Sequence, residues 1–401
     1  MIHLSNGQAR RFMLLKQGLL GKHIFIEKSG ALEFVRQAGC IQFDPVDICG
    51  KNAELTLQSR VKRFKKEQLY ELLYTDRNLF DYPDKQLSII PVEDWPYFER
   101  FRAAARSKLL QHPELKEHIV NIRAYIEENG AVCSGDFKLE GKTDWYSAIN
   151  WSTGGTMARS VLEQMYSSGD LIIHHKKGAR RYYDLAERHI PAEILNAPEP
   201  FPDEFSHQKW RVRRRIGAVG LIWDSASCAW LNIWGLTTET RHKIFNELLD
   251  EGTISKLKID GLKSDFYFLT EDMPLVEQVL SDSKFEPRCE LIAPLDPLLW
   301  DKKLIRKIFG FDYGWEIYTP PQNRKYGVYV LPLLWGDKFI GRAEPVCDRN
   351  NKKLTVKNIW YEPDVKLTKK QRKAVLSCLK NFAKFNDCEL EKSDLTDSLE
   401  M

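Results

Sequence analysis

The sequence predicts an α+β fold made of three tandem winged helix-turn-helix modules and a C-terminal β-barrel-like domain. The prediction depends on a helix-and-turn pattern that occurs three times, on short β-rich runs beyond residue 281, and on an amphipathic closing helix. A chain of 401 residues is also too long for one ordinary core. We therefore expect three modules at 1–95, 96–190 and 191–280, a barrel-like domain at 281–365, and a closing helix with an acidic tail at 366–401.

Each copy of the repeat starts with apolar residues at helical spacing and continues into a turn that favours a hairpin. The copies begin at Leu69, Val161 and Ile244, and their apolar positions superpose. In the second and third copies the helix is expected to end at Gly169 and Gly252, because glycine readily adopts the left-handed conformation at a helix end. A helix followed by a hairpin is the order of a recognition helix and its wing. The three hairpin tips are expected at 83–85, 177–178 and 260–261.

Capping residues and apolar periodicity locate the other helices. Ser5 and Gln8 form a predicted capping box in front of a first helix. A second helix is expected over 30–38, and a short one after Ser134. Further helices of the second and third modules are expected at 118–129, 204–215 and 224–234.

The sequence pattern changes beyond residue 281, where turn residues separate short runs rich in β-forming residues. Such runs predict a small barrel or a strongly curved sheet. Thr368 and Gln371 form another capping box before the closing helix, and the acidic tail from Glu389 is expected to fray. The strands are expected at 315–318, 326–330, 338–342 and 354–357.

The first module carries the segment on which the functional prediction depends, Gln42-Phe43-Asp44-Pro45. In an extended segment, alternate side chains share a face, so Gln42 and Asp44 would project together while Phe43 anchors the segment in the core. A carboxylate beside a carboxamide is suited to holding and polarising a water molecule. An aspartate before proline is also ordinary turn chemistry, which the segment by itself favours.

Basic residues cluster at two places, although the net charge of +4 and the pI near 8.4 are only mildly basic. Cations on winged-helix elements commonly neutralise DNA phosphates, which gives affinity without sequence information. A solvated charged face is the alternative for either run alone, and two runs favour DNA. The candidates are Lys176, Lys177, Arg180 and Arg181 at the second hairpin, and Arg211, Arg213, Arg214 and Arg215 before the third copy.

Other features argue against a metal site or a membrane span. The eight cysteines are scattered without a Cys-x-x-Cys pair, and the adjacent His174 and His175 fit a basic strand better than a zinc site. No apolar run approaches about 18 residues. We expect a monomeric, cytoplasmic protein with no metal and no cofactor.

Two groups of motifs resemble the AlkZ/YcaQ-like bacterial DNA glycosylases of the winged-helix superfamily. The first is Gln42-Phe43-Asp44 followed by Leu55-x-Leu57-x-Ser59-Arg60, and the resemblance spans nearly the whole chain. The second group is fairly specific and consists of Pro294-Leu-Asp296-Pro-Leu298, Phe311-x-Tyr313, Tyr318-x-Pro320-x-x-x-Arg324-x-Tyr326-Gly327 and Val330-Leu-Pro332.

The resemblance implies a monofunctional glycosylase that excises alkylated purines, including crosslinked ones, from duplex DNA, with Gln42 and Asp44 as the catalytic pair. Arg324 and Lys325 are expected on a hairpin near the lesion. One departure concerns the positions where family members often have Arg-Ala-His-His, because this chain has Lys51-Asn52-Ala53-Glu54 there. The alternatives are a winged-helix transcription regulator without catalysis and, with no carboxylate cluster to support it, a nuclease.

Overall fold

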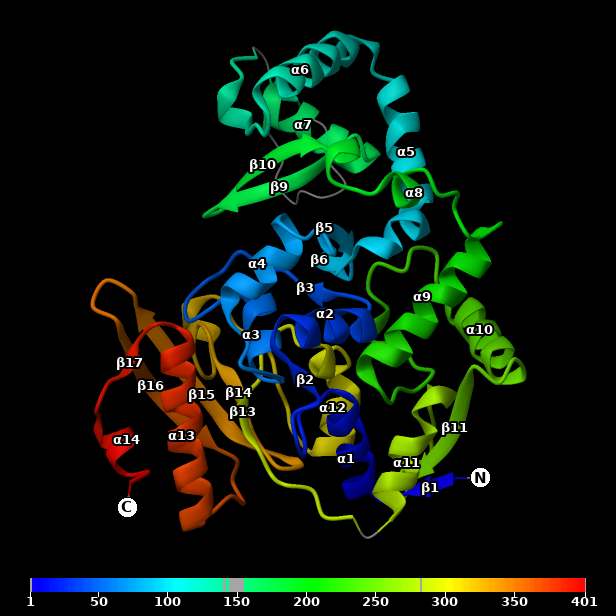
Figure 1. Ribbon diagram of the computed structural model, residues 1–401. Coiled ribbons are helices and arrows are strands. Elements are labelled where there is room, and N and C mark those ends of the chain that lie inside the picture. Colours follow the sequence, from blue (N-terminus) through cyan, green and yellow to red (C-terminus); the bar gives the residue numbers. More distant parts are fainter. Residues whose placement is uncertain (1, 140–141, 144–154, 282, 401) are drawn as a thin grey trace. The chain divides into compact units, whose positions relative to one another are not determined.

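The computed structural model describes residues 2–139, 142–143, 155–281 and 283–400 (Figure 1). The chain divides into two compact units, one formed by Met1–Leu69 with Gln208–Met401 and the other by Tyr70–His207. The five divisions expected from the sequence stay predictions. Among the described helices, none is long and apolar enough to cross a membrane.

The first unit opens with short strands and helices. The capping box predicted at Ser5 is confirmed, because its side chain accepts from the backbone of Gln8 and the Gln8 side chain accepts from the backbone of Ser5. β2 pairs with β4 in parallel. The elements are β1 (Ile2–Leu4), α1 (Asn6–Lys16), β2 (Phe25–Ile26), α2 (Glu27–Ala38), β3 (Ile41–Gln42), α3 (Asn52–Gln58), β4 (Val61–Lys62) and the first part of α4 (Lys66–Tyr74).

The third copy of the repeat also belongs to this unit. β11 and β12 form the expected hairpin around residues 260–261, and β1 adds to β11 in parallel. The helix predicted over 224–234 is wrong, since only a 3₁₀ turn, η5 (Cys228–Trp230), forms there. Asn232 has a φ angle of 65°, which interrupts a right-handed helix. The other elements are the greater part of α9 (Glu204–Val219), α10 (Thr238–Asp250), β11 (Ile254–Ile259), β12 (Asp265–Leu269), η6 (Thr270–Asp272) and α11 (Met273–Leu280).

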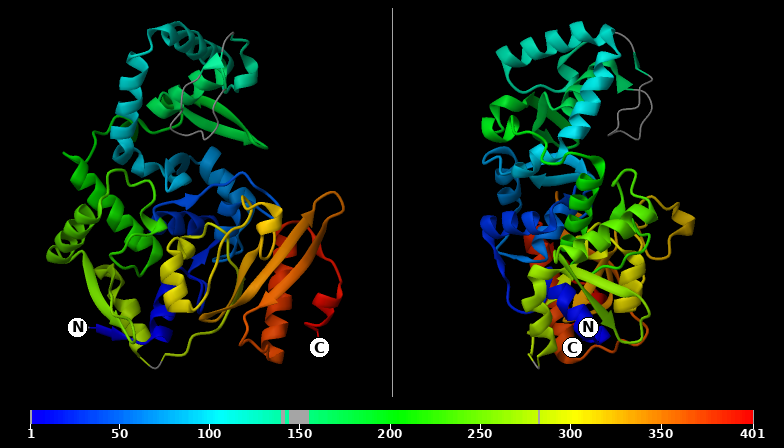
Figure 2. Two further views of the ribbon diagram at one scale, coloured as in Figure 1. Left: turned by 180° about the vertical axis from the view of Figure 1, so that it is seen from behind. Right: turned by 90° about the vertical axis from the view of Figure 1, so that its right-hand side faces the viewer.

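The C-terminal part of the first unit is an open five-stranded sheet in the order β13-β14-β15-β16-β17. Its neighbours are antiparallel except β16 and β17, and bulges interrupt the β14–β15 and β15–β16 registers. Helix α13 lies against this sheet (Figure 1 and Figure 2), and its apolar residues belong to the same core cluster as those of the strands. The bounds are β13 (Cys289–Leu291), η7 (Pro297–Leu299), α12 (Lys302–Phe309), η8 (Pro321–Asn323), β14 (Leu331–Trp335), β15 (Lys338–Asp348), β16 (Lys353–Tyr361), α13 (Lys369–Phe385), β17 (Glu389–Leu390) and α14 (Asp394–Asp397).

Two C-terminal predictions need correction. Residues 315–318 and 326–330 are irregular rather than strands. The tail does not fray, because β17 joins the sheet and Ser393 caps α14. Of the two forms expected from the sequence, a small barrel or a curved sheet, the strands of this part form an open sheet.

The second unit holds the first two hairpins. β5 and β6 turn at residue 85, and β9 and β10 turn at residues 178–179 with Gly178 at a φ of 60°, so both predicted tips are confirmed. The elements are β5 (Leu79–Asp84), β6 (Gln86–Pro91), η1 (Val92–Phe98), α5 (Glu99–Leu110), η2 (Pro113–Leu115), α6 (Lys116–Asn129), η3 (Ser134–Asp136), β7 (Lys142–Thr143), β8 (Gly155–Thr156), α7 (Met157–Ser168), β9 (Leu171–Lys177), β10 (Arg180–Leu185), η4 (Ala186–Arg188) and α8 (Ala192–Leu195).

A helix followed by an antiparallel hairpin is therefore present in all three copies of the repeat: α4, α7 and α10 precede β5–β6, β9–β10 and β11–β12. The short helix expected after Ser134 begins as η3, and residues 140–141 and 144–154 of that segment lie outside the described residues. The assignment of the three copies as winged helices stays a prediction.

Candidate active site

The Gln42-Phe43-Asp44 segment leaves the end of β3 and enters a loop. Gln42, the last residue of β3, is only 4% exposed, whereas Asp44 lies partly exposed beyond the strand. Phe43 is half-buried, so the expectation that its ring anchors the segment in the core is wrong. The strand ends at Gln42, and regular alternation therefore does not extend to Asp44. Of the two polar groups, Asp44 is the one with access to solvent.

The carboxylate of Asp44 accepts two hydrogen bonds in this loop. Its Oδ1 accepts a hydrogen bond of 2.9 Å from the backbone N–H of Val46, which is the turn geometry that Asp before Pro45 favours. It also accepts a hydrogen bond from the hydroxyl of Tyr318, a side chain that is 77% exposed. Burial raises the pKa of Asp44, and the hydrogen bonds from Val46 and Tyr318 oppose that rise. The turn interpretation and the functional one are thus compatible.

Asn52 holds the backbone of the motif in place. Its Nδ2 donates to the carbonyl of Gln42 at 2.8 Å, and its Oδ1 accepts from the backbone N–H of Leu295 at 2.8 Å. The side chain is 1% exposed, so both hydrogen bonds are shielded from water. Asn52 therefore joins the motif strand to the Pro294–Leu298 segment, the two parts of the chain that carried the resemblance.

The other positions of the departure are also structural. Ala53 and Glu54 are buried, and a Glu54 carboxylate oxygen accepts from the backbone N–H of Lys51 at 3.2 Å. The Nζ atoms of Lys51 and Lys66 each lie 3.9 Å from Glu54. A buried carboxylate needs such partners, because an unpaired charge is costly in the interior. These residues stabilise the start of α3.

Arg60 and Asp296 form a buried ion pair between the two sets of motifs. Arg60 Nη1 and Asp296 Oδ2 are 2.9 Å apart, and both side chains are fully buried. Arg60 also donates to the carbonyl of Gln17 at 3.0 Å and stacks over the ring of Phe34. Asp296 in addition accepts from the backbone N–H of Leu298. The Ser-Arg and Pro-Leu-Asp-Pro motifs therefore hold the unit together.

The loop that presents Tyr318 is built around a glutamate. The Glu316 carboxylate accepts from the backbone N–H groups of Lys325 and Tyr326, each at 2.9 Å, and of Gly327 at 3.2 Å. These N–H groups are the ones that a strand would have used, which explains why the segment is not a hairpin. Arg324 donates to the carbonyl of Thr319 at 2.8 Å, while Lys325 is exposed.

The basic run on α9 packs largely inside its unit. Arg211 and Arg215 are 3% and 1% exposed, and Arg211 donates to the carbonyl of Asn232. Arg214 donates to the carbonyl of Gly39, and Arg215 to the sulfur of Cys40, so both contact the segment that leads into β3. Gly39 has a φ of 71°, and a Cβ there would lie 2.7 Å from Arg214. Arg213, with a side chain that is 43% exposed, lies 3.5 Å from Glu271.

The cations of the second hairpin differ in exposure. Lys176 forms an ion pair of 2.5 Å with Asp81, and its side chain is 9% exposed. Lys177 and Arg180 flank the exposed tip, while Arg181 is half-buried and hydrogen-bonded to Tyr183. Lys177 and Arg180 are thus the residues of this group best placed to reach a phosphate.

Comparisons with known proteins support an assignment for this arrangement. The model of the DNA glycosylase AlkZ-like family matches residues 35–385. The structure is similar to the Streptomyces sahachiroi DNA glycosylase AlkZ with a TM-score of 0.61 at 15% identity, covering 97% of this chain and 100% of that one. At this identity the structural likeness indicates a shared fold.

Proposed function

The chain belongs to the AlkZ-like DNA glycosylase family, and we propose that it hydrolyses the N-glycosidic bond of N7-alkylated purines in duplex DNA, including purines in interstrand crosslinks. The observation that carries the proposal is the partly exposed Asp44 carboxylate, held by Val46 and Tyr318 directly after the buried Gln42. A partly buried but accessible carboxylate is suited to stabilising positive charge that develops on a substrate.

Departure of the base needs little help from a general acid. An N7-alkylated guanine is cationic, so its bond to the sugar carbon C1′ breaks with the electron pair going to the base, which leaves neutral. The deoxyribose becomes positively charged, and a water molecule bonds to C1′ and loses a proton. Asp44 stabilises the sugar cation and accepts that proton, as a carboxylate does in glycoside hydrolysis. The products are the free base and an abasic site, as for a monofunctional enzyme.

The surrounding residues position Asp44. The backbone N–H of Val46 holds one carboxylate oxygen, so the group keeps one orientation relative to the loop. The Tyr318 hydroxyl favours the ionised form of Asp44, which is the form that a base requires. Because Gln42 is buried, its carboxamide acts beneath the surface and helps to position the catalytic loop. Asp44 is the group that approaches the sugar more closely.

Duplex binding is assigned to exposed cations, which act through phosphates without reading sequence. Lys177 and Arg180 at the tip of β9–β10 are our first choice, followed by Arg213 and Lys325, all of which have exposed or partly exposed side chains. We propose a monomeric cytoplasmic protein that acts on damaged DNA.

The test is single-turnover release of base from a duplex carrying one N7-methylguanine. We expect Asp44→Asn to slow release by at least about a hundredfold, the usual contribution of a positioned acid–base group. Gln42→Ala is expected to slow it by a smaller factor. Asp364→Asn is the matched control, since Asp364 is an exposed aspartate of the same unit. Wild-type rates in both Asp44→Asn and Gln42→Ala would refute the assignment. Release from a crosslinked duplex tests the wider lesion range.

A further inference from the structure

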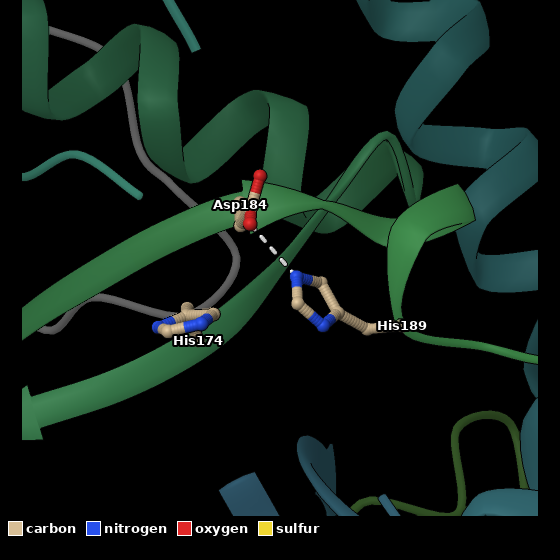
Figure 3. Close-up of side chains that lie close together, drawn as sticks. All are labelled: His174, Asp184 and His189. Atoms are coloured by element: carbon tan, nitrogen blue, oxygen red, sulfur yellow. Dashed lines mark hydrogen bonds and ion pairs between the residues drawn. The ribbon is translucent and has the colours of Figure 1, made fainter. Parts of the chain in front are cut away.

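Three potential metal ligands meet beside the β9–β10 hairpin, in the second unit. His174 comes from β9, Asp184 from β10, and His189 from the turn after η4 (Figure 3). One ligand atom from each lies within 4.8 Å of the other two. The sequence spacing hides this cluster, because the three residues belong to separate elements. It has no role in the glycosylase chemistry described above.

A β-bulge explains why His174 faces Asp184. The register pairs His175 with Tyr182 and Ile173 with Tyr183, so His174 is the extra residue on its strand. Adjacent residues of a regular strand point to opposite faces, but the Nδ1 atoms of His174 and His175 lie only 2.8 Å apart. Bulges commonly redirect side chains in this way at binding sites. The bulge brings both imidazoles to the face that carries Asp184.

One carboxylate oxygen of Asp184 contacts groups outside the cluster, and the other points toward the cluster. Its Oδ1 accepts from the backbone N–H of Leu185 at 2.8 Å and lies 3.3 Å from Arg188. Its Oδ2 is 2.7 Å from His189 Nε2. Asp184 therefore offers Oδ2 as a ligand atom to the cluster.

The two imidazoles of the cluster can each offer a ring nitrogen to an ion. A neutral imidazole has a free lone pair, and binding of a metal requires a deprotonated ligand. The hydrogen bond between the Nδ1 atoms of His174 and His175 holds the orientation of the His174 ring, as partners of ligating histidines commonly do.

We propose that His174, Asp184 and His189 bind one divalent transition-metal ion, with zinc the best match to two imidazoles and a carboxylate. On binding, the ring proton that His189 Nε2 shares with Asp184 moves to Nδ1 by exchange with solvent, so that Nε2 binds the ion, and water completes the coordination. Zinc–ligand bonds of about 2.0–2.2 Å place tetrahedral ligand atoms roughly 3.3 Å apart. The pair at 2.7 Å must open slightly and the most distant atoms, at up to 4.8 Å, must approach, which is movement on the scale of side-chain torsions.

Two arginines limit the affinity. Arg188 lies beside Asp184 and donates to the carbonyls of Ile126 and Glu127, and Arg77 donates to the carbonyls of Ile173 and His174. Their positive charges repel a divalent cation, so we expect a dissociation constant in the micromolar range rather than that of a tight structural zinc site. When bound, the ion ties the turn after η4 to the base of the hairpin whose tip carries Lys177 and Arg180.

The test uses the full chain after treatment with a chelator. Zn²⁺ is titrated by calorimetry, and Co²⁺ by the visible absorption of its tetrahedral complexes. We expect one equivalent of either ion to bind, and Asp184→Asn and His189→Ala to weaken binding by at least about tenfold. Asp184→Asn is nearly isosteric and can keep an oxygen for the Leu185 N–H, which protects the fold. The control is His112→Ala, because His112 pairs with Glu114 at 3.0 Å and is not part of the cluster.

A second readout is the melting temperature, which bound zinc raises in the wild-type chain but not in Asp184→Asn. Binding should also weaken as the pH falls, since protons compete for the imidazoles. Failure of the wild-type chain to bind one equivalent at submillimolar metal would overturn the proposal. Wild-type affinity in Asp184→Asn would do the same. Neither result depends on excision activity, so the proposal stands or falls separately from the glycosylase assignment.

Discussion

Asn52→Ala tests whether the Asn52 side-chain amide holds the backbone of the Gln42–Asp44 segment in place. The side chain is 1% exposed and makes two hydrogen bonds of 2.8 Å, to the Gln42 carbonyl and from the Leu295 N–H. Each buried polar group left without a partner costs about 1–3 kcal/mol, so the two losses sum to about 2–6 kcal/mol before any relaxation. Water entering the vacated space recovers part of this, and we expect a loss of about 2–4 kcal/mol in the free energy of unfolding.

The same change should slow catalysis, because the carbonyl that it releases belongs to the residue two positions before Asp44. A small displacement of a catalytic group costs on the order of a hundredfold in rate, and we expect at least about tenfold here. Urea denaturation measures stability through the midpoint and slope. Single-turnover release of N7-methylguanine measures the rate, in buffer without urea, where the variant is fully folded.

Asn52→Asp separates the two hydrogen bonds. An aspartate keeps an oxygen for the Leu295 N–H but has no donor for the Gln42 carbonyl, and its second oxygen repels that carbonyl. We therefore expect excision to fall as in Asn52→Ala. Asn350→Ala is the control, as Asn350 is exposed in the same unit. A stability loss under about 1 kcal/mol in Asn52→Ala, together with a wild-type excision rate, would refute the reasoning.

Two further predictions concern charge. Burial raises the pKa of Asp44, so the excision rate should fall with decreasing pH through a midpoint above that of an ordinary aspartate. Tyr318→Phe removes a hydrogen bond to the charged form, so it should raise this pKa further and move the acid limb of the profile to higher pH. A pH–rate profile that Tyr318→Phe leaves unchanged contradicts the role of the hydroxyl. Replacing Lys177 and Arg180 by alanine should weaken affinity for undamaged duplex and reduce the slope of log K against log salt by about one unit for each phosphate that is no longer neutralised. An unaltered slope removes both side chains from the interface.

Much of the local structure could be predicted, because its determinants are close together in sequence. The capping boxes at Ser5 and Thr368 formed as their spacing predicts, and the hairpin tips lie at the expected turns. The strand prediction failed where a side chain from elsewhere in the chain accepts the N–H groups that would pair with a neighbouring strand. Residues 326–330 have a β-rich composition, but the Glu316 carboxylate takes the N–H groups at the start of that run. Composition alone does not reveal that competition.

The candidate site was only half visible in the sequence. Gln42 and Asp44 could be singled out because they are neighbours, whereas Tyr318 lies more than 270 positions further along and had no assigned role. Asn52 was noticed only as a departure from the family pattern, and its hydrogen bonds show it to be structural. The proposed metal ligands could not be predicted for a similar reason: His174 faces Asp184 through a β-bulge, and strand alternation does not predict a bulge.

The arginines of α9 show why a basic run is a weak guide to a DNA interface. A charge at the surface is free to neutralise a phosphate, but a guanidinium that is 1–3% exposed, as in Arg211 and Arg215, has already exchanged its water for protein partners. Bringing it out to a phosphate would leave those partners unsatisfied, at a cost comparable to the stabilisation that the new ion pair provides. Arg214 and Arg215 instead contact Gly39 and Cys40, immediately before the motif strand. These hydrogen bonds hold the backbone that leads into the motif, and we expect affinity for the duplex to depend on fewer cations than the sequence suggests.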